Sequence, residues 1–268
     1  MKVGIIGCGF IGNTLANAVE SIVEIEELYL FDRNISSSEG LASGLNKSKA
    51  QASVQALIEH ADLVIEAASQ DAVWEYAQSV LERGRDLMIM SVGALVDDKF
   101  WETLQVTAKN NRCKIFLPSG AICGIDGLKS ASIAGIDEIT IETTKPPKGL
   151  EEVRYITKQG IDLSKLTEPL TIFYGPAREA VKHFPKNVNI AACVSLAGIG
   201  FDKTNIKLIA DPAITRNQHK LICRGRFGEF TCEVNNMPSI TNPKTSYLAA
   251  LSAIATLKKI VGGVWIGT

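Results

Sequence analysis

The sequence has little that would direct the protein to nucleic acid, a membrane or an export route. Its 28 basic and 29 acidic side chains leave a net charge of -1, so no electrostatic attraction to polyanions is expected. No run of about 18 apolar residues occurs, which argues against a transmembrane helix. The opening MKVGIIGCGF reaches glycines too early for the apolar region of a signal peptide. We therefore expect a cytoplasmic protein with no nucleic-acid or membrane partner.

The cysteines form no recognisable motif, and histidine is scarce. None of the six cysteines belongs to a C-x-x-C pair and most lie in apolar runs, which favours reduced, buried thiols over disulfides or a metal site. The three histidines restrict the search for a general acid or base to His60, His183 and His219. His60 and His183 end predicted helices, where a histidine complements the helix dipole, so surface roles are expected for both.

The first part of the chain alternates short apolar strands with helices. Strands are expected at 2–6, 27–32, 62–69, 87–91 and 114–118, and helices at 11–23, over most of 39–60, at 71–83 and around 97–109. This alternation predicts a parallel sheet with both faces covered. It ends near Pro118, so the first domain is assigned to residues 1–120.

Beyond this boundary the apolar pattern has a period of two. Strands are expected at 138–144 and 205–210 and in a hairpin of 219–225 with 229–235, and helices at 177–183 and 187–199. Such alternation indicates a largely antiparallel sheet with one covered face, in an α+β domain of residues 121–240. Asn242-Pro243 precedes a helix within 241–268 that is expected to pack back on the first domain.

The segment GCGFIG, residues 7–12, carries Gly7, Gly9 and Gly12 in the G-x-G-x-x-G spacing, with Phe10 and Ile11 between them. It follows a strand and opens a helix, and an acid, Asp32, ends the next strand about 20 residues later. This context predicts a Rossmann domain whose helix N-terminus binds a pyrophosphate. A tight glycine turn without a ligand is the alternative.

Asp32 can accept hydrogen bonds from the adenosine ribose, which favours NAD. The neighbouring Arg33 can stack on adenine or contact a 2′-phosphate, so NAD or NADP remains open as cofactor. Ser69, Ser91 and the segment Ser119-Gly120-Ala121 follow strands of this domain, at the edge where open α/β sheets bind ligands. Each of these segments can equally be only a turn.

His219 differs from the other two histidines because it begins a hairpin strand and shares a face with Leu221 and Cys223. A buried structural histidine and a catalytic one are both compatible with that position. Lys186, Asn187 and Asn189 open the helix after Pro185, where a cation and amides suit a carboxylate or carboxamide. The alternative is that Asn187 only caps the helix.

Five segments occur in an order that resembles the L-aspartate dehydrogenase family. They are Pro118-Ser-Gly-Ala-Ile-Cys-Gly124, Thr144-Lys-Pro-Pro-Lys148, Phe184-Pro-Lys-Asn-Val-Asn-Ile-Ala-Ala192, Ala210-Asp-Pro212 and Asn242-Pro-Lys-Thr-Ser246. Together with GCGFIG and a histidine soon after Asp211-Pro212, the resemblance runs from residue 1 to about residue 260. Cys123 departs from the pattern, since other members often have glycine or alanine there.

The resemblance implies an enzyme that oxidises L-aspartate with NAD or NADP to iminoaspartate. That product either enters NAD biosynthesis or hydrolyses to oxaloacetate and ammonia, and the reaction is reversible. It further implies a homodimer, in which the second domain at residues 121–240 would bind the substrate and form the dimer contact. It also implies the catalytic histidine at His219 and coenzyme contacts at Ala121 and Asn189.

The chemistry of the residues fits this assignment. A neutral histidine with a pKa near ~6.5 can carry the proton of the substrate ammonium. Two substrate carboxylates require cationic and amide donors, for which Lys186, Asn187 and Ser119 are the candidates.

Two other readings remain. One is a different Rossmann oxidoreductase, related to homoserine dehydrogenase or dihydrodipicolinate reductase, which substrate profiling would reveal. The other is a nucleotide-sensing protein without catalysis, in which His219 would face an apolar core.

Overall fold

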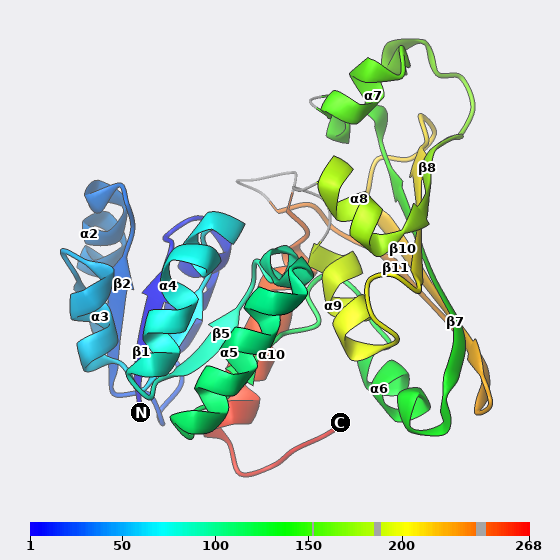
Figure 1. The fold of residues 1–268 in the computed structure, drawn as a ribbon. Helices are drawn as coiled ribbons and strands as arrows, with labels where there is room; N and C mark the ends of the chain where they lie inside the picture. The colour runs from blue at the N-terminus through cyan, green and yellow to red at the C-terminus, as the bar shows by residue number, and fades with distance from the viewer. Residues whose placement is uncertain (152, 185–188, 240–244) are drawn as a thin grey trace. The chain divides into compact units, whose positions relative to one another are not determined.

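The structure is a computed structural model that describes residues 1–151, 153–184, 189–239 and 245–268. It divides into two compact units, shown in Figure 1. Unit 1 consists of Met1–Pro118 with Ala250–Trp265, and unit 2 of Ser119–Ala249 with Ile266–Thr268.

Unit 1 is built on a parallel sheet with strand order β3-β2-β1-β4-β5-β6. The strands are β1 (Lys2–Ile6), β2 (Glu27–Phe31), β3 (Ser48–Ala50), β4 (Leu63–Glu66), β5 (Asp86–Ile89) and β6 (Ile115–Phe116). The helices are α1 (Phe10–Val19), α2 (Ile35–Ser43), α3 (Val54–His60), α4 (Gln70–Glu82) and α5 (Asp98–Asn110). Because the order reverses between β1 and β4, the ligand edge of this Rossmann sheet lies beyond the carboxyl ends of these two strands.

One expectation for unit 1 is wrong. The segment 39–60, expected to be mostly helical, contains β3 between α2 and α3. Strand β3 pairs with β2 through Leu28–Ser48, Tyr29–Lys49 and Leu30–Ala50. An edge strand of this kind is held by backbone hydrogen bonds, so it needs no apolar pattern that the sequence would reveal.

The C-terminal helix α10 (Tyr247–Val261) supplies part of the core of unit 1. Ala253 and Leu257 are fully buried in one cluster with Val3 and Ile5 of β1. Burying a leucine side chain stabilises a fold by about 1.5–3 kcal/mol, so this helix is an integral part of the unit.

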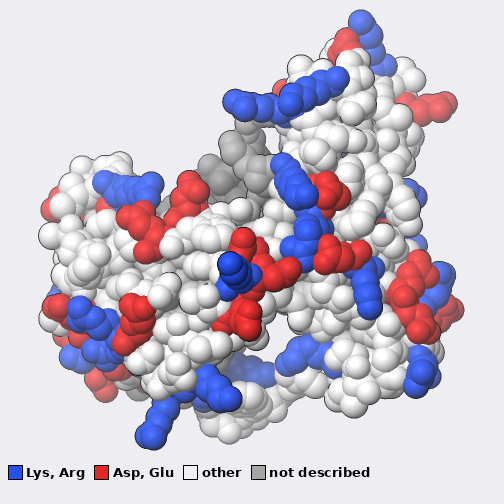
Figure 2. All heavy atoms as spheres, viewed as in Figure 1, with Lys and Arg blue, Asp and Glu red and all other residues white. Residues whose placement is uncertain are grey.

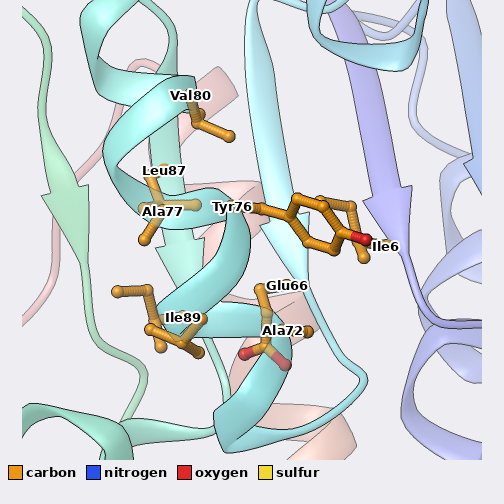
Figure 3. A pocket seen from close by; sticks show the side chains of 9 residues that line it. Ile6, Glu66, Ala72, Tyr76, Ala77, Val80, Leu87 and Ile89 are labelled. Atoms are coloured by element: carbon orange, nitrogen blue, oxygen red, sulfur yellow. The ribbon is translucent and has the colours of Figure 1, made fainter. Parts of the chain in front are cut away.

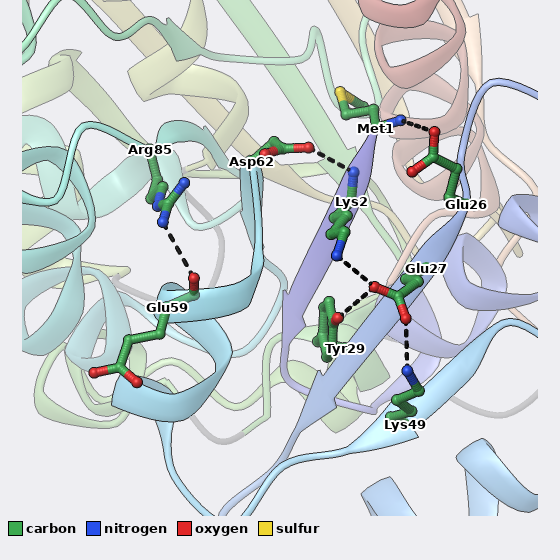
Figure 4. A network of polar contacts seen from close by, with 9 residues as sticks. All are labelled: Met1, Lys2, Glu26, Glu27, Tyr29, Lys49, Glu59, Asp62 and Arg85. Atoms are coloured by element: carbon green, nitrogen blue, oxygen red, sulfur yellow. Dashed lines mark hydrogen bonds and ion pairs between the residues drawn. The ribbon is translucent and has the colours of Figure 1, made fainter.

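The amino ends of the strands, opposite the ligand edge, are joined by ion pairs (Figure 4). Lys2 and Lys49 both bind the carboxylate of Glu27, and the Tyr29 hydroxyl donates to it at 2.6 Å. Hydrogen bonds from Lys2 first, then from Lys49 and Tyr29, lower the pKa of Glu27 to about 2. These charges join neighbouring strands and leave the opposite edge of the sheet for ligands.

Unit 2 contains a mixed, largely antiparallel sheet with order β11-β10-β7-β9-β8, in which only β7 and β9 run parallel. Its strands are β7 (Ile136–Lys145), β8 (Leu170–Pro176), β9 (Thr204–Ala210), β10 (Gln218–Gly225) and β11 (Gly228–Asn235). Its α-helices are α6 (Ile125–Ala134), α7 (Arg154–Lys158), α8 (Ala177–His183) and α9 (Asn189–Ala197). The predicted fold class is confirmed, although α6, α7 and β8 had no prediction.

One face of the unit 2 sheet is covered. Buried residues alternate along β7 (Ile139, Ile141, Thr143, Lys145), β9 (Thr204, Ile206, Leu208, Ala210) and β10 (His219, Leu221, Cys223). Helices α6, α8 and α9 contact these strands. The residues at alternate positions face the other side of the sheet and are mostly polar, as a half-covered antiparallel sheet requires.

Within the described part of the chain, no helix is long and apolar enough to cross a membrane. Basic and acidic side chains are intermixed on the face drawn in Figure 2, and neither sign dominates. Cys113, Cys193 and Cys223 are buried, and no disulfide is present among the described residues.

Candidate active site

The three glycines of the loop after β1 have different surroundings and different roles. Gly7 has a φ of 99°, and a Cβ placed there would lie 2.8 Å from the Ala67 carbonyl oxygen. A Cβ on Gly12 would lie 1.9 Å from the Gly7 carbonyl oxygen, so both positions exclude a side chain. Gly9 is exposed and has no neighbour within 4 Å of such a Cβ among the described atoms. The fold itself requires Gly7 and Gly12, whereas the space at Gly9 is open to a ligand.

Helix α1 begins directly after this space. Its N-cap is Gly9, and no side chain caps the helix in the part of the chain that the structure describes. The amides of a first helical turn and the positive end of the helix dipole suit a pyrophosphate. The residues present therefore fit a dinucleotide, and Phe10, Ile11 and Gly12 form the turn that would hold its phosphates.

Asp32 joins the end of β2 to the glycine loop. Its carboxylate accepts hydrogen bonds from the Cys8 amide at 2.8 Å and from the Asn34 amide at 2.9 Å. The side chain is only half-buried, so it remains within reach of a ribose hydroxyl. The neighbouring Arg33 is exposed and forms an ion pair with Glu75 of α4 at 2.6 Å.

Glu66, at the carboxyl end of β4, is a residue that the sequence analysis missed. It is only 2% exposed and accepts hydrogen bonds from the Ser91 amide, the Ser91 hydroxyl and the Ala68 amide at 2.8–2.9 Å. Burial raises the pKa of Glu66, and the hydrogen bonds from Ser91 and Ala68 partly oppose that shift. Glu66 thus fixes the loops after β4 and β5 at the ligand edge. An acid ending an apolar strand, the signal that identified Asp32, also marks Glu66.

The two serines expected at this edge have structural contacts. The Ser91 hydroxyl donates a hydrogen bond to the Glu66 carboxylate at 2.9 Å. The Ser69 hydroxyl caps α4 by accepting a hydrogen bond from the Ala72 amide at 3.2 Å. Ser91 is buried whereas Ser69 is exposed, so of the two only Ser69 lies at the surface for a ligand.

Beneath α4 lies a small gap, seen in Figure 3, between the helix and the sheet. Its lining is apolar apart from Glu66 and Tyr76 and comprises Ile6, Glu66, Ala72, Val73, Tyr76, Ala77, Val80, Leu87 and Ile89. These side chains pack helix on strand, so the gap is part of the core.

In unit 2, His219 lies on the covered face of β10, directly opposite Thr143 of β7. Its Nδ1 atom is 3.0 Å from the Thr143 hydroxyl oxygen, and the side chain is 5% exposed. Burial, together with the charge of Lys145, lowers the pKa of His219 to about 3. The expected pKa near ~6.5 is wrong for this buried side chain, because that value belongs to a hydrated imidazole. His219 is therefore neutral at physiological pH.

Lys145, the last residue of β7, also went unrecognised as a site residue in the sequence. It lies two residues beyond Thr143 on the same face and is 7% exposed. Burial lowers its pKa to about 8. Lys145 is the next residue in the period-two pattern of Ile139, Ile141 and Thr143. That pattern could therefore have predicted its place on the covered face.

The segment Ser119–Ala121 is held by a buried asparagine. The Asn236 side-chain amide, which is 2% exposed, donates to the Ala121 carbonyl oxygen at 2.9 Å. Asn189 is the first residue of α9 and is exposed. Lys186 and Asn187 lie outside the described residues.

The other two histidines make ring contacts instead. His60 stacks on Tyr29 with centroids 5.1 Å apart, and His183 packs against Tyr155 at 4.6 Å. Of the three histidines, His219 alone lies beside a buried cation. The described residues contain no cluster of three side chains that could hold a metal ion.

A parallel Rossmann sheet with an open glycine loop, and a second unit with a buried neutral histidine, define a pyridine-nucleotide oxidoreductase. Residues 126–260 match the family model of the aspartate dehydrogenase C-terminal domain, and residues 7–118 match that of the homoserine dehydrogenase NAD-binding domain. The chain belongs to the L-aspartate dehydrogenase family.

Known L-aspartate dehydrogenases are similar to this chain over its whole length. The chain is 51% identical to the L-aspartate dehydrogenase of Methanosarcina acetivorans, covering 100% of both chains. It is 40% identical to that of Nitrosopumilus maritimus, covering 100% of this chain and 99% of the relative. The crystal structure of aspartate dehydrogenase from Thermotoga maritima matches with a TM-score of 0.79 at 30% identity, covering 100% and 99% of the two chains.

Proposed function

We propose that this protein catalyses the reversible oxidation of L-aspartate to iminoaspartate with NAD or NADP. Iminoaspartate then hydrolyses to oxaloacetate and ammonia or serves NAD biosynthesis. The observation that carries the mechanism is the buried, neutral His219 with Thr143 on one ring nitrogen and the Lys145 cation nearby. Family membership supplies the substrate, and the two units supply the groups that the reaction needs.

The coenzyme is assigned to unit 1. Gly7, Gly9, Phe10, Ile11 and Gly12 would hold the pyrophosphate. Asp32 would bind the adenosine ribose, with Arg33 and Ser69 beside it. A bound nicotinamide coenzyme would supply the hydride acceptor for oxidation of the substrate Cα. The remaining steps are positioning and proton transfer, which belong to side chains of the protein.

His219 is proposed as the acid and base. In the tautomer whose Nδ1–H donates to the Thr143 hydroxyl, the lone pair of Nε2 is available to a proton from the substrate ammonium. Loss of that proton gives the amino nitrogen the electron pair that forms the C=N bond as hydride leaves Cα. In the reverse direction the same atom returns the proton.

The remaining contacts are proposals from the sequence. Ala121 and Asn189 are assigned to the coenzyme, and Ser119, Lys186 and Asn187 to the substrate. The hydrogen bond from the Asn236 side chain to the Ala121 carbonyl oxygen supports a fixed position for the segment Ser119–Ala121. Ser91, which the sequence also assigned to the coenzyme, is not proposed as a contact, because Glu66 accepts hydrogen bonds from both its amide and its hydroxyl and the residue is buried.

The test is a steady-state assay of aspartate oxidation and of oxaloacetate amination, each with both coenzymes. Turnover of aspartate is expected, and the His219→Ala variant should lower kcat by roughly 10²–10⁴-fold with nearly unchanged NADH binding. Activity only on homoserine or dihydrodipicolinate would support a different oxidoreductase, and coenzyme binding without turnover would support a sensor. Unchanged turnover in the variant would remove His219 from the mechanism.

We infer from the family resemblance that the protein works as a cytoplasmic homodimer. Analytical ultracentrifugation of the purified protein should give a mass near twice 28.9 kDa. A monomer at assay concentrations would contradict this assignment.

A further inference from the structure

Asn236 follows β11 and lies on the same face of the unit 2 sheet as His219. The strand register places His219 opposite Val234, and the Asn236 amide donates to the Asn217 carbonyl oxygen at 2.9 Å, which continues the pairing by one residue. Asn235 is exposed, whereas Asn236 is only 2% exposed. Because side chains two residues apart in a strand share a face, Asn236 lies with Val234 and His219. The Cα atoms of such diagonal neighbours are about 7–8 Å apart, so one small molecule can contact both side chains.

The segment that begins unit 2 holds the Asn236 side chain in one orientation. Its Nδ2 atom donates to the Ala121 carbonyl oxygen at 2.9 Å. Because a carbonyl oxygen only accepts, the nitrogen of the amide must face Ala121 and the oxygen must point elsewhere. A Cβ on Gly124 would lie 2.8 Å from Sγ of Cys232 and 3.3 Å from the side chain of Leu221. The same segment therefore runs along the covered face of the sheet.

The oxygen of this amide is a buried acceptor. Among the residues that the structure describes, no donor reaches Oδ1 of Asn236. A buried polar atom without a hydrogen bond is costly in free energy, and such an atom normally receives one from a ligand or a water molecule when the protein supplies none. Oδ1 of Asn236 is therefore a candidate ligand contact within reach of His219.

The chemistry of an acceptor restricts the ligand group, which must carry an N–H or an O–H. The two carboxylates of aspartate are ionised at neutral pH and only accept hydrogen bonds, so the amino group is the one donor of this substrate. The pyrophosphate and adenosine ribose of the coenzyme are assigned to unit 1. The carboxamide of the nicotinamide is then the competing donor.

We propose that Oδ1 of Asn236 accepts a hydrogen bond from the amino group of the substrate and thereby directs another N–H of that group toward Nε2 of His219. The assignment rests on the proposed function for the identity of the substrate. In the direction of amination the same oxygen binds ammonia. Asn236 is thus the residue that distinguishes an amino acid from the dicarboxylic acid of the same length.

The experiment measures how much the amino group adds to binding. L-Aspartate and succinate differ only in that group, and neither reacts in the complex with NADH because the coenzyme is already reduced. The dissociation constants of both for the NADH complex give the ratio of succinate Kd to aspartate Kd. Loss of the hydrogen bond to Ala121 alters the position of a segment for both ligands alike, so its effect cancels in this ratio.

Asn236→Leu removes the acceptor and keeps a side chain of similar volume. The ratio should fall about 10- to 100-fold, as expected for the loss of a hydrogen bond from a charged donor. In amination assays the KM for ammonia should rise by a similar factor, and more than the KM for oxaloacetate. Asn236→Ala makes the same removal without the bulk of leucine, should Asn236→Leu not fold.

Two further variants test whether the oxygen itself is responsible. Asn236→Asp keeps an acceptor oxygen at this position and should keep or increase the ratio, whatever the change in absolute affinity. Asn235→Leu is the matched control, because Asn235 is the exposed neighbour on the opposite face, and it should match the wild type. Circular dichroism establishes that each variant is folded.

An unchanged ratio in folded Asn236→Leu or Asn236→Ala overturns the proposal, as does an equal fall in Asn236→Leu and Asn236→Asp. A loss of NADH affinity with an unchanged ratio also overturns it and assigns Oδ1 to the nicotinamide carboxamide.

The proposal and the proposed function fail separately. If the wild type does not oxidise aspartate but loses the ratio in Asn236→Leu, the reaction falls and the amino-group contact stands. If the wild type oxidises aspartate and the ratio is unchanged in the variant, only the role of Asn236 falls.

Discussion

The Thr143 hydroxyl lies 3.0 Å from Nδ1 of His219, on the neighbouring strand and in direct register with it. This contact fixes the ring orientation and leaves Nε2 as the nitrogen to which the proposed mechanism assigns the substrate proton. Thr143→Val keeps the shape of the side chain and removes the hydroxyl. It leaves a buried ring nitrogen unsatisfied, which costs about 1–3 kcal/mol. We expect kcat for aspartate oxidation to fall about 10-fold or more, with NADH affinity unchanged.

Two further variants distinguish this role from a general loss of stability. Thr143→Ser restores the hydroxyl and should recover most of the turnover. Thr140→Val removes a hydroxyl from the opposite face of the same strand, where Thr140 contacts Glu138 at 3.4 Å, and should leave kcat unchanged. Equal effects of Thr143→Val and Thr143→Ser would show that the hydroxyl does not position His219.

The glycine loop gives a pair of substitutions with opposite consequences. Gly9 has a φ of -70°, which alanine tolerates, and a Cβ there meets no neighbour among the described atoms. Gly9→Ala should therefore fold with wild-type stability but bind NADH at least about 10-fold more weakly, because the methyl group takes the space of the pyrophosphate.

Gly12→Ala should fail for a different reason. Its Cβ would lie 1.9 Å from the Gly7 carbonyl oxygen, a backbone atom that no side-chain rotation can move away. We expect a loss of about 2 kcal/mol or more in unfolding free energy, measured by urea denaturation without coenzyme.

Unaltered NADH affinity in Gly9→Ala would mean that the coenzyme does not approach this loop.

The ion pair between Arg33 and Glu75 bears on the choice of coenzyme. Both side chains are exposed, and such pairs contribute only about 0.2–1 kcal/mol. Glu75→Gln should free Arg33 for a 2′-phosphate and raise the ratio of kcat/KM for NADPH over NADH about 2- to 5-fold. Glu82→Gln on the same helix is the control, because Glu82 contacts Gln78 instead. An unchanged ratio in Glu75→Gln would exclude Arg33 as a determinant of specificity.

The sequence predicted the features that depend on local pattern. The glycine spacing, the acid at Asp32 and the alternation in β7, β10 and β11 all follow from the periods of strands and turns. They fixed the class of both sheets and placed His219 on a covered face, as the structure confirms.

The features that escaped prediction depend on packing. The short edge strand β3 has no apolar pattern because backbone pairing with β2 suffices. Glu66 and Lys145 are charged residues, which a composition-based reading places at the surface. Their burial arises only when strands distant in sequence become neighbours. The lowered pKa of His219 could not be predicted from the sequence for the same reason, since both its burial and its closeness to the Lys145 charge arise only in the assembled sheet.

The lowered pKa of His219 predicts a specific loss of stability in acid. Above the unfolded pKa of 6.5 the residue is neutral in both states, so its contribution is fully present. As the pH falls below 6.5, the unfolded chain takes up a proton that folded His219 refuses until about pH 3, so stability decreases through this window. From neutral pH to pH 5 the loss amounts to about 2 kcal/mol, at about 1.4 kcal/mol per pH unit.

His219→Gln removes the titrating group and keeps a polar side chain. Urea denaturation of both proteins at neutral pH and at pH 5 should show that the wild type loses about 2 kcal/mol more unfolding free energy than the variant. The remaining titratable groups are the same in the two chains, so their contributions cancel in this comparison. The stability of the wild type relative to the variant must therefore decrease as the pH falls. A difference that stays constant over this range would mean that His219 is hydrated in the folded protein, and its place as a buried neutral base would then be lost.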